Sequence, residues 1–151
     1  MNNPEGPVLV AWASRTGNTA NLAQRIKEIL EREGLEVALT PVSLVDWRAL
    51  DQWSALVFGS PTYGSGDLHP DWDKPERLLR EMNLAGWPAA AFGCGNPRYD
   101  TPWWAVDILA NRLKNGGAKM LVPPYKADTL TGFRVRDADA WIEELTDALR
   151  S

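Results

Sequence analysis

The sequence contains one cysteine, Cys94, and one histidine, His69, among its 151 residues. A single cysteine excludes an internal disulfide, and so few soft or imidazole ligands exclude a cysteine-rich or histidine-cluster metal centre. No apolar run approaches the roughly 20 residues that cross a bilayer, and the polar opening MNNPEGP does not resemble a signal peptide. We therefore expect a cytoplasmic protein with no metal centre.

Positive charge is also sparse. Sixteen Lys and Arg face twenty Asp and Glu, which gives a net charge of −4, and both signs are spread along the chain. No basic stripe is available for a nucleic-acid backbone, and no polybasic patch for a lipid surface, so neither is an expected partner. With 44% hydrophobic residues at this length, the sequence predicts a single domain spanning residues 1–151.

Short apolar runs alternate with helical patterns from end to end. Strands are predicted at 8–12, 35–42, 55–60, 88–93 and 118–125, the last weakened by its prolines. Helical apolar faces are predicted within 22–30, 78–82, 105–113 and 141–149. Because parallel neighbours need helical crossovers, this alternation predicts a doubly wound α/β fold whose parallel sheet is covered on both faces.

The turn after the first predicted strand is rich in hydrogen-bonding groups. Residues 14–19 read Ser-Arg-Thr-Gly-Asn-Thr and lead into a predicted helix. A helix N-terminus attracts anions, and short neutral donors around a glycine suit a terminal phosphate. The same residues are also ordinary helix caps, so capping stays open as the alternative. Arg15 is expected in solvent, with a salt bridge to the phosphate as its alternative.

Two further loops have unusual composition. They span 61–72 and 93–104, and each places one tyrosine, Tyr63 or Tyr99, among glycines, prolines and short polar residues. In the common strand order 2-1-3-4-5, the loops after strands 1, 3 and 4 meet at the carboxyl edge of the sheet. Two tyrosines on converging loops beside a phosphate site favour a planar ring held between them.

The segments SRTGNTA, SPTYGSGDL and FGCGNPRYDTPWWAVDIL together resemble the three cofactor loops of flavodoxins, and the match runs through nearly the whole chain. The resemblance implies a flavodoxin-like three-layer sandwich with a five-stranded parallel sheet of order 2-1-3-4-5. It also implies non-covalently bound FMN and an electron carrier rather than an enzyme. No twenty-residue insertion interrupts the fifth strand, which resembles the short-chain subgroup.

Carried over by position, the resemblance gives each loop a role. Residues 14–19 would hold the FMN phosphate, while Thr62 and Tyr63 would lie along the inner flavin face and Tyr99 on the outer face. Gly95 and Asn96 would bind the pyrimidine edge, and the Gly64 peptide would accept a hydrogen bond from the protonated flavin N5. The implied site comprises Ser14, Arg15, Thr16, Gly17, Asn18, Thr19, Pro61, Thr62, Tyr63, Gly64, Ser65, Gly66, Cys94, Gly95, Asn96, Tyr99, Asp100 and Trp103.

Three features depart from the family pattern: Asn96 where an aspartate is frequent, the positive Arg98 in the outer loop, and a modest net acidity. Less negative charge around the flavin predicts a second-electron potential that is less negative than in an acidic relative. The resemblance implies a monomer that takes electrons from a ferredoxin/flavodoxin reductase-type donor and passes them to acceptor enzymes. Four acidic loop residues would steer a basic reductase, or else are solvated loop charges: Asp67, Asp71, Asp73 and Asp100.

Other classes fit less well. An FMN-dependent NAD(P)H:quinone-type reductase shares fold and cofactor, but no residue or extra loop is apparent to hold a nicotinamide. A C-x5-R phosphatase would need arginine where Asp100 stands, and a receiver domain would need an aspartate where Ser60 ends the third strand. His69 has no visible partner for acid–base chemistry and is expected in solvent.

Overall fold

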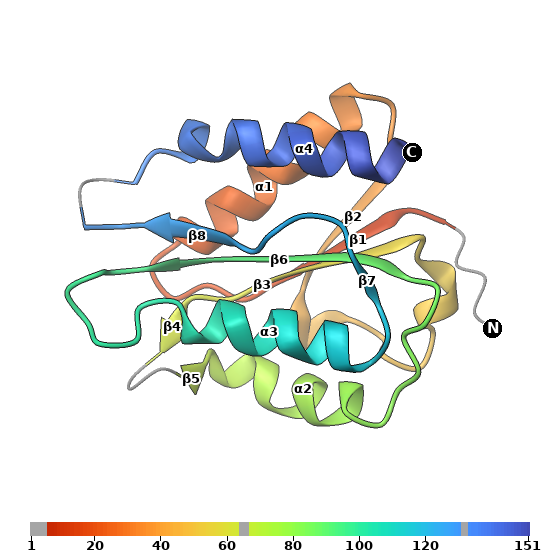
Figure 1. Cartoon of the computed structure of the whole chain (residues 1–151), viewed down its shortest axis with the longest axis horizontal. Coiled ribbons are helices and arrows are strands. Elements are labelled where there is room, and N and C mark those ends of the chain that lie inside the picture. Colours follow the sequence, from red (N-terminus) through yellow and green to blue (C-terminus); the bar gives the residue numbers. More distant parts are fainter. Residues whose placement is uncertain (1–5, 64–66, 131–132) are drawn as a thin grey trace.

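The computed structural model describes residues 6–63, 67–130 and 133–151, with the side chain of Tyr63 outside the description. A six-stranded parallel sheet forms its centre, in the order β2-β1-β3-β6-β7, with β8 also paired to β6 (Figure 1). The strands are β1 (Val8–Trp12), β2 (Val37–Pro41), β3 (Ala55–Gly59), β6 (Pro88–Gly95), β7 (Lys119–Met120) and β8 (Tyr125–Asp128). The predicted order 2-1-3-4-5 is therefore confirmed.

The fifth strand is present as two pieces. β7 pairs with the beginning of β6, and β8 pairs with its end through Phe92↔Tyr125 to Gly95↔Asp128. Residues 121–124 separate the pieces and include Pro123 and Pro124, which have no N–H to donate to a ladder. The sequence predicted that the prolines weaken this strand, but it placed the strand's end where β8 begins. The strand instead continues beside the carboxyl end of β6.

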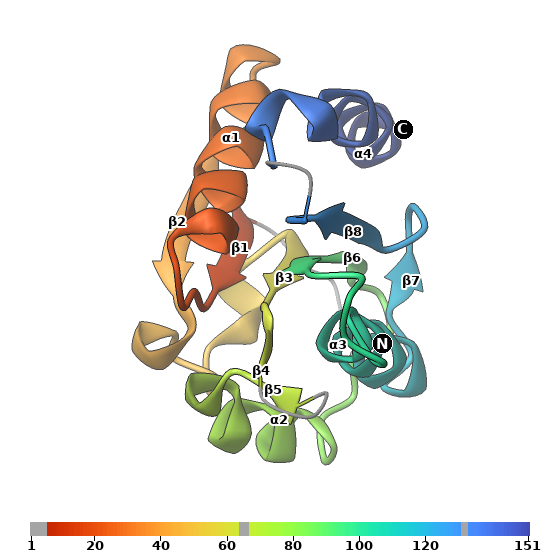
Figure 2. The ribbon, with the colours of Figure 1, turned by 90° about the vertical axis from the view of Figure 1, so that its left-hand side faces the viewer.

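Helices cover both faces, which gives the predicted three layers. Figures 1 and 2 show α1 (Asn18–Arg32) and α4 (Asp139–Arg150) on one face, with α2 (Asp73–Leu79) and α3 (Trp104–Asn115) on the other. Alternate residues of β1 enter two separate cores, because successive strand side chains point to opposite faces. Leu9 packs in the core beneath α2 and α3, whereas Val8 and Val10 pack beneath α1 and α4.

The second helix differs from the prediction. It ends at Leu79, so Met82 lies beyond it, and Leu78 is 40% exposed although the predicted apolar face included it. Short 3-10 turns complete the chain at η1 (Val42–Leu44), η2 (Leu50–Gln52), η3 (Pro70–Trp72) and η4 (Val135–Ala138). In the described chain, no helix has the length and apolar character that a membrane crossing requires.

The loop after β3 is more regular than its composition suggested. It contains a small antiparallel pair, β4 (Thr62–Tyr63) and β5 (Asp67–Leu68). Trp72 is fully buried and donates from Nε1 to the carbonyl of Gly59 at 2.9 Å, which ties the far end of the loop to β3. The predicted roles of Gly64, Ser65 and Gly66 lie outside the described residues.

Candidate functional site

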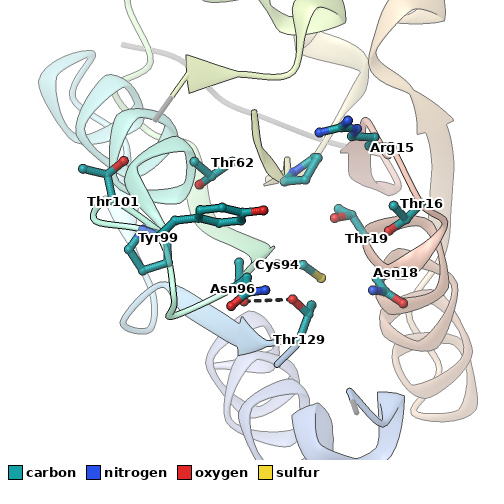
Figure 3. Close-up of a pocket in the computed structure, with 13 residues that line it drawn as sticks. Arg15, Thr16, Asn18, Thr19, Thr62, Cys94, Asn96, Tyr99, Thr101 and Thr129 are labelled. Carbon is teal, nitrogen blue, oxygen red and sulfur yellow. Dashed lines mark hydrogen bonds between the residues drawn. The ribbon is translucent and has the colours of Figure 1, made fainter. Parts of the chain in front are cut away.

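A pocket of about 320 Å³ opens where β1, β3, β6 and β8 end (Figure 3). Its walls come from four segments: the turn before α1, the segment after β3, the loop after β6 and the residues after β8. Parallel strands bring their carboxyl ends to one edge, so segments far apart in the sequence meet there. The lining residues are Arg15, Thr16, Asn18, Thr19, Pro61, Thr62, Cys94, Gly95, Asn96, Tyr99, Thr101, Pro102 and Thr129.

The turn before α1 is shaped by Gly17. Its φ of +95° lies in the left-handed region that favours glycine, and its N–H donates to Ser14 Oγ at 3.0 Å. Gly17 is the N-cap residue and has no side chain that could cap α1, and the first turn of the helix carries no acidic residue. The positive end of this 15-residue helix therefore faces the pocket without a local carboxylate.

Thr19 provides the clearest polar signal at this end. The residue is 1% exposed, and its Oγ1 has no hydrogen-bond partner of ordinary geometry within the described structure. Buried hydroxyls are normally hydrogen-bonded, since an unpaired one costs about 1–3 kcal/mol. An anion at the helix N-terminus would supply the missing acceptor. This arrangement favours the phosphate interpretation over simple capping, because Thr19 caps nothing.

Cys94 forms the pocket wall beside Thr19. Burial raises the pKa of its thiol to about 11 from 9.0, with the neighbouring Thr19 hydroxyl acting weakly in the opposite direction. The thiol is therefore neutral at physiological pH and places no negative charge next to an anion. Its apolar, neutral surface suits the uncharged middle of a phosphate-bearing ligand.

At the other end, the loop after β6 presents Tyr99. Asn96 organises this loop: its Oδ1 accepts the N–H of Arg98 at 2.9 Å, and its carbonyl accepts the N–H of Tyr99 at 3.0 Å. Tyr99 is 69% exposed and lines the pocket, so its ring is available to a planar ligand. The predicted second ring, Tyr63, has its side chain outside the described residues.

The neighbouring segments are held in place by side chains that accept hydrogen bonds from backbone N–H groups. Thr62 Oγ1 accepts the N–H of Ala105 at 3.3 Å, which joins the segment after β3 to the start of α3. Ser60 Oγ accepts the N–H of His69 at 3.1 Å. The prediction that His69 lies in solvent is wrong: its side chain is 16% exposed, and Nδ1 accepts the N–H of Asp71.

Of the eighteen predicted site residues, ten line the pocket: Arg15, Thr16, Asn18, Thr19, Pro61, Thr62, Cys94, Gly95, Asn96 and Tyr99. Ser14 and Gly17 shape the turn without lining the pocket, and Asp100 is exposed outside it. Trp103 is half-buried against the core, and its Nε1 donates to the carbonyl of Ala127 at 3.0 Å. Trp103 therefore fastens α3 to β8.

Three lining residues were missed. Thr101 and Pro102 lie in the sequence between the predicted positions Asp100 and Trp103. Gly95 is the residue that lets this segment approach β6, because a Cβ at Gly95 would collide with the Pro102 carbonyl. Thr129 follows β8, beyond the predicted end of the fifth strand. No pattern in the sequence placed that residue at the pocket.

Comparison with known proteins shows the family to which this fold belongs. The flavodoxin family model matches residues 10–143. A flavodoxin of Nitratidesulfovibrio vulgaris is 30% identical over 145 residues, which cover 94% of this chain and 98% of that protein. The crystal structure of oxidised flavodoxin 2 from Bacillus cereus superimposes with a TM-score of 0.87 at 28% identity, covering 94% of this chain and 99% of that one.

A longer relative shares only this region. The NADPH-dependent diflavin oxidoreductase 1 of Gibberella zeae is 33% identical over 126 residues, which cover 80% of this chain but 21% of that protein. The chain therefore spans about a fifth of the length of this relative and nearly the full length of the Nitratidesulfovibrio protein.

Proposed function

Since the chain belongs to the flavodoxin family, whose proteins bind FMN and transfer electrons, we propose that it carries single electrons at low potential between a reductase and acceptor enzymes. The hydroxyl of Thr19 at the start of α1 is the observation that most supports it, because it is buried and has no hydrogen-bond partner of ordinary geometry within the described residues. In a pocket whose opposite end carries an exposed tyrosine, this hydroxyl fits a ligand with an anionic tail and a flat head.

We propose that the phosphate binds at the start of α1. Thr16, Asn18 and Thr19 line the pocket there, and the first N–H groups of a helix have no intrahelical acceptors. Ser14 would hold the turn through its bond to the Gly17 N–H. Arg15 also lines the pocket and would add a cation near the phosphate.

We propose that the flavin ring binds at the opposite end of the pocket. Tyr99 would stack on the ring's outer face, Thr62 would lie along its inner face, and the Gly95–Asn96 segment would meet the pyrimidine edge. When bound, FMN supplies the one-electron chemistry, and the protein's share is orientation, exclusion of water and local charge. Tyr63 and residues 64–66 keep their predicted roles at the inner face as part of this proposal.

Local charge sets the direction of the expected potential. Asn96 is neutral, and the exposed Arg98 follows it in the same turn. A neutral amide and a nearby cation oppose the negative charge of the fully reduced flavin less than an acidic loop does. We therefore propose a second-electron potential less negative than that of a strongly acidic relative.

Partners would dock at the open mouth of the pocket. Two large apolar side chains are exposed on the loop after β6 and at the start of α3, Tyr99 at 69% and Trp104 at 54%. Asp67 and Asp100 are exposed as well and would attract a basic reductase. The monomeric state, the single domain over residues 1–151 and the ferredoxin/flavodoxin reductase-type donor belong to this proposal.

The proposal is tested by adding FMN to the apoprotein. We expect quenching of FMN fluorescence at micromolar concentrations or below, a visible flavin spectrum for the purified holoprotein, and release of FMN rather than FAD on denaturation. Failure of added FMN to bind would overturn the proposal. Steady NADPH oxidation by the holoprotein without an added reductase would instead favour the quinone-reductase alternative.

A further inference from the structure

Thr129, the first residue after β8, makes two hydrogen bonds to one acceptor. Its backbone N–H donates to the Gly95 carbonyl at 3.0 Å, and its Oγ1 donates to the same carbonyl at 3.1 Å. Asp128 pairs with Gly95 in the β6–β8 register, and its Oδ1 accepts the N–H of Leu130 at 2.8 Å. The segment therefore leaves β8 through an Asx turn that holds Thr129 against the end of β6.

These bonds fix what each group offers to a ligand. A carbonyl oxygen has two lone pairs, and both of those on Gly95 are engaged by Thr129. The Thr129 hydroxyl donates its only hydrogen to that carbonyl. Its oxygen can therefore still accept a hydrogen bond, but the hydroxyl cannot donate a second one. Because Thr129 lines the pocket, its oxygen is an acceptor available to a ligand that donates (Figure 3).

The position of Thr129 in the pocket indicates which part of the ligand would lie next to it. It is hydrogen-bonded to Gly95, the last residue of β6, which follows Cys94 and precedes Asn96. Cys94 adjoins the Thr19 hydroxyl at the phosphate end, whereas Asn96 begins the loop that carries Tyr99. Thr129 therefore faces the middle of the pocket. In FMN, the ribityl chain joins the phosphate to the ring, and its hydroxyl groups are hydrogen-bond donors.

We infer that the Thr129 hydroxyl accepts a hydrogen bond from a ribityl hydroxyl, so that the segment after β8 is a fourth cofactor-binding segment. The inference rests on the proposed function in taking FMN as the ligand. It assigns a binding contact to a residue outside the three predicted loops. A purely structural Thr129 would instead act only by holding Gly95 and the loop that follows it.

The test compares three flavins on apoprotein with Thr129→Val and Thr129→Ser. Valine keeps the shape and the backbone bond to Gly95 but removes the hydroxyl, and serine restores the hydroxyl. FMN and riboflavin both carry the ribityl chain, whereas lumiflavin carries only the ring system. Dissociation constants are measured by fluorescence quenching, and thermal unfolding of each apoprotein checks that it is folded.

We expect Thr129→Val to weaken FMN and riboflavin by the same factor, roughly two- to tenfold, which is the effect of one neutral hydrogen bond. Lumiflavin binding should not change, and Thr129→Ser should bind all three flavins like the original chain. Equal weakening of all three flavins by Thr129→Val would assign Thr129 to loop support alone and overturn the inference, as would no weakening at all. If the unmodified chain fails to bind FMN, the proposed function itself fails, which is a separate result.

Discussion

Replacing Thr19 with valine should stabilise the apoprotein and weaken its affinity for FMN. The stability effect follows from the free chain, where Oγ1 is buried and has no hydrogen-bond partner of ordinary geometry. Exchanging that hydroxyl for a methyl group of similar size removes a desolvation penalty of about 1–3 kcal/mol. A gain of about 1 kcal/mol in the free energy of unfolding raises the Tm of a chain of this length by about 2–4 °C.

The binding effect has the opposite sign. A hydrogen bond to a charged group contributes about 1.5–3 kcal/mol, so losing the bond from Thr19 to phosphate should raise the Kd of FMN by about 10- to 150-fold. Riboflavin has no phosphate and should bind the Thr19→Val variant as it binds the unmodified chain. Thermal unfolding of the apoprotein and fluorescence titration with both flavins measure the two effects separately.

Thr146 provides a matched control. It is another buried threonine within a helix, 2% exposed, but its Oγ1 donates to the Ile142 carbonyl at 2.7 Å. Thr146→Val should therefore leave FMN affinity unchanged and should not stabilise the apoprotein, because its hydroxyl is already satisfied. A Thr19→Val apoprotein that is less stable and still binds FMN with unchanged affinity would refute the reasoning. The buried hydroxyl would then neither destabilise the free protein nor contact the phosphate.

Three further predictions concern charge. Asn96→Asp places a charge roughly 8 Å from the flavin, which at an effective dielectric of about 20–40 should lower the second-electron potential by about 40–90 mV in a redox titration; an unchanged or higher potential contradicts this. Arg25 holds the pKa of Asp139 below its usual 3.8 mainly through their hydrogen bonds, so the pair stabilises the fold above that pH and loses its effect as pH falls through the lowered value; in urea unfolding, Asp139→Asn should destabilise the protein more at pH 7 than at pH 2. The raised pKa of Cys94 predicts alkylation by iodoacetamide at pH 8 about 100-fold slower in the native apoprotein than in urea, and equal rates would contradict it.

The strands at the centre of the sheet are visible in the sequence because both of their faces are buried. All five residues of β3 are buried, and four of the five in β1, so these strands read as unbroken apolar runs. Their helical crossovers show equally clear apolar faces. The order of the strands then follows from rules of chain connection more than from any single residue.

The edge strand β8, by contrast, cannot be recognised in the sequence by an apolar run. β8 reads Tyr-Lys-Ala-Asp, with one fully buried residue, Ala127, and two prolines directly before it. Its strand conformation depends on pairing with β6, a contact between residues more than thirty positions apart. Local propensity does not record such a contact. Misplacing this boundary at Tyr125 also hid Thr129.

The residue types at the site were predictable, but the direction of each side chain was not. Trp103 was expected at the flavin because it follows the Tyr99 loop, yet its indole N–H is bonded to the Ala127 carbonyl of a strand distant in sequence. Ser14 was expected at the phosphate, yet its oxygen serves the Gly17 N–H. Both side chains are used within the fold, and a count of polar or aromatic residues in a loop does not distinguish that use from ligand binding.

The distinction becomes clear from how each hydrogen-bonding group is used. Ser14 Oγ, Thr62 Oγ1 and Asn96 Oδ1 each accept a backbone N–H and so hold a loop in shape. Thr19 Oγ1 has no such partner, and Thr129 Oγ1 has given its hydrogen away but keeps its lone pairs. The two remaining groups differ in what they can offer, since Thr19 still has a hydrogen for an anion and Thr129 accepts from a hydroxyl. A phosphate next to a polyhydroxyl chain would satisfy both, so the unused bonding capacity of the free chain supports the proposed ligand more directly than its composition does.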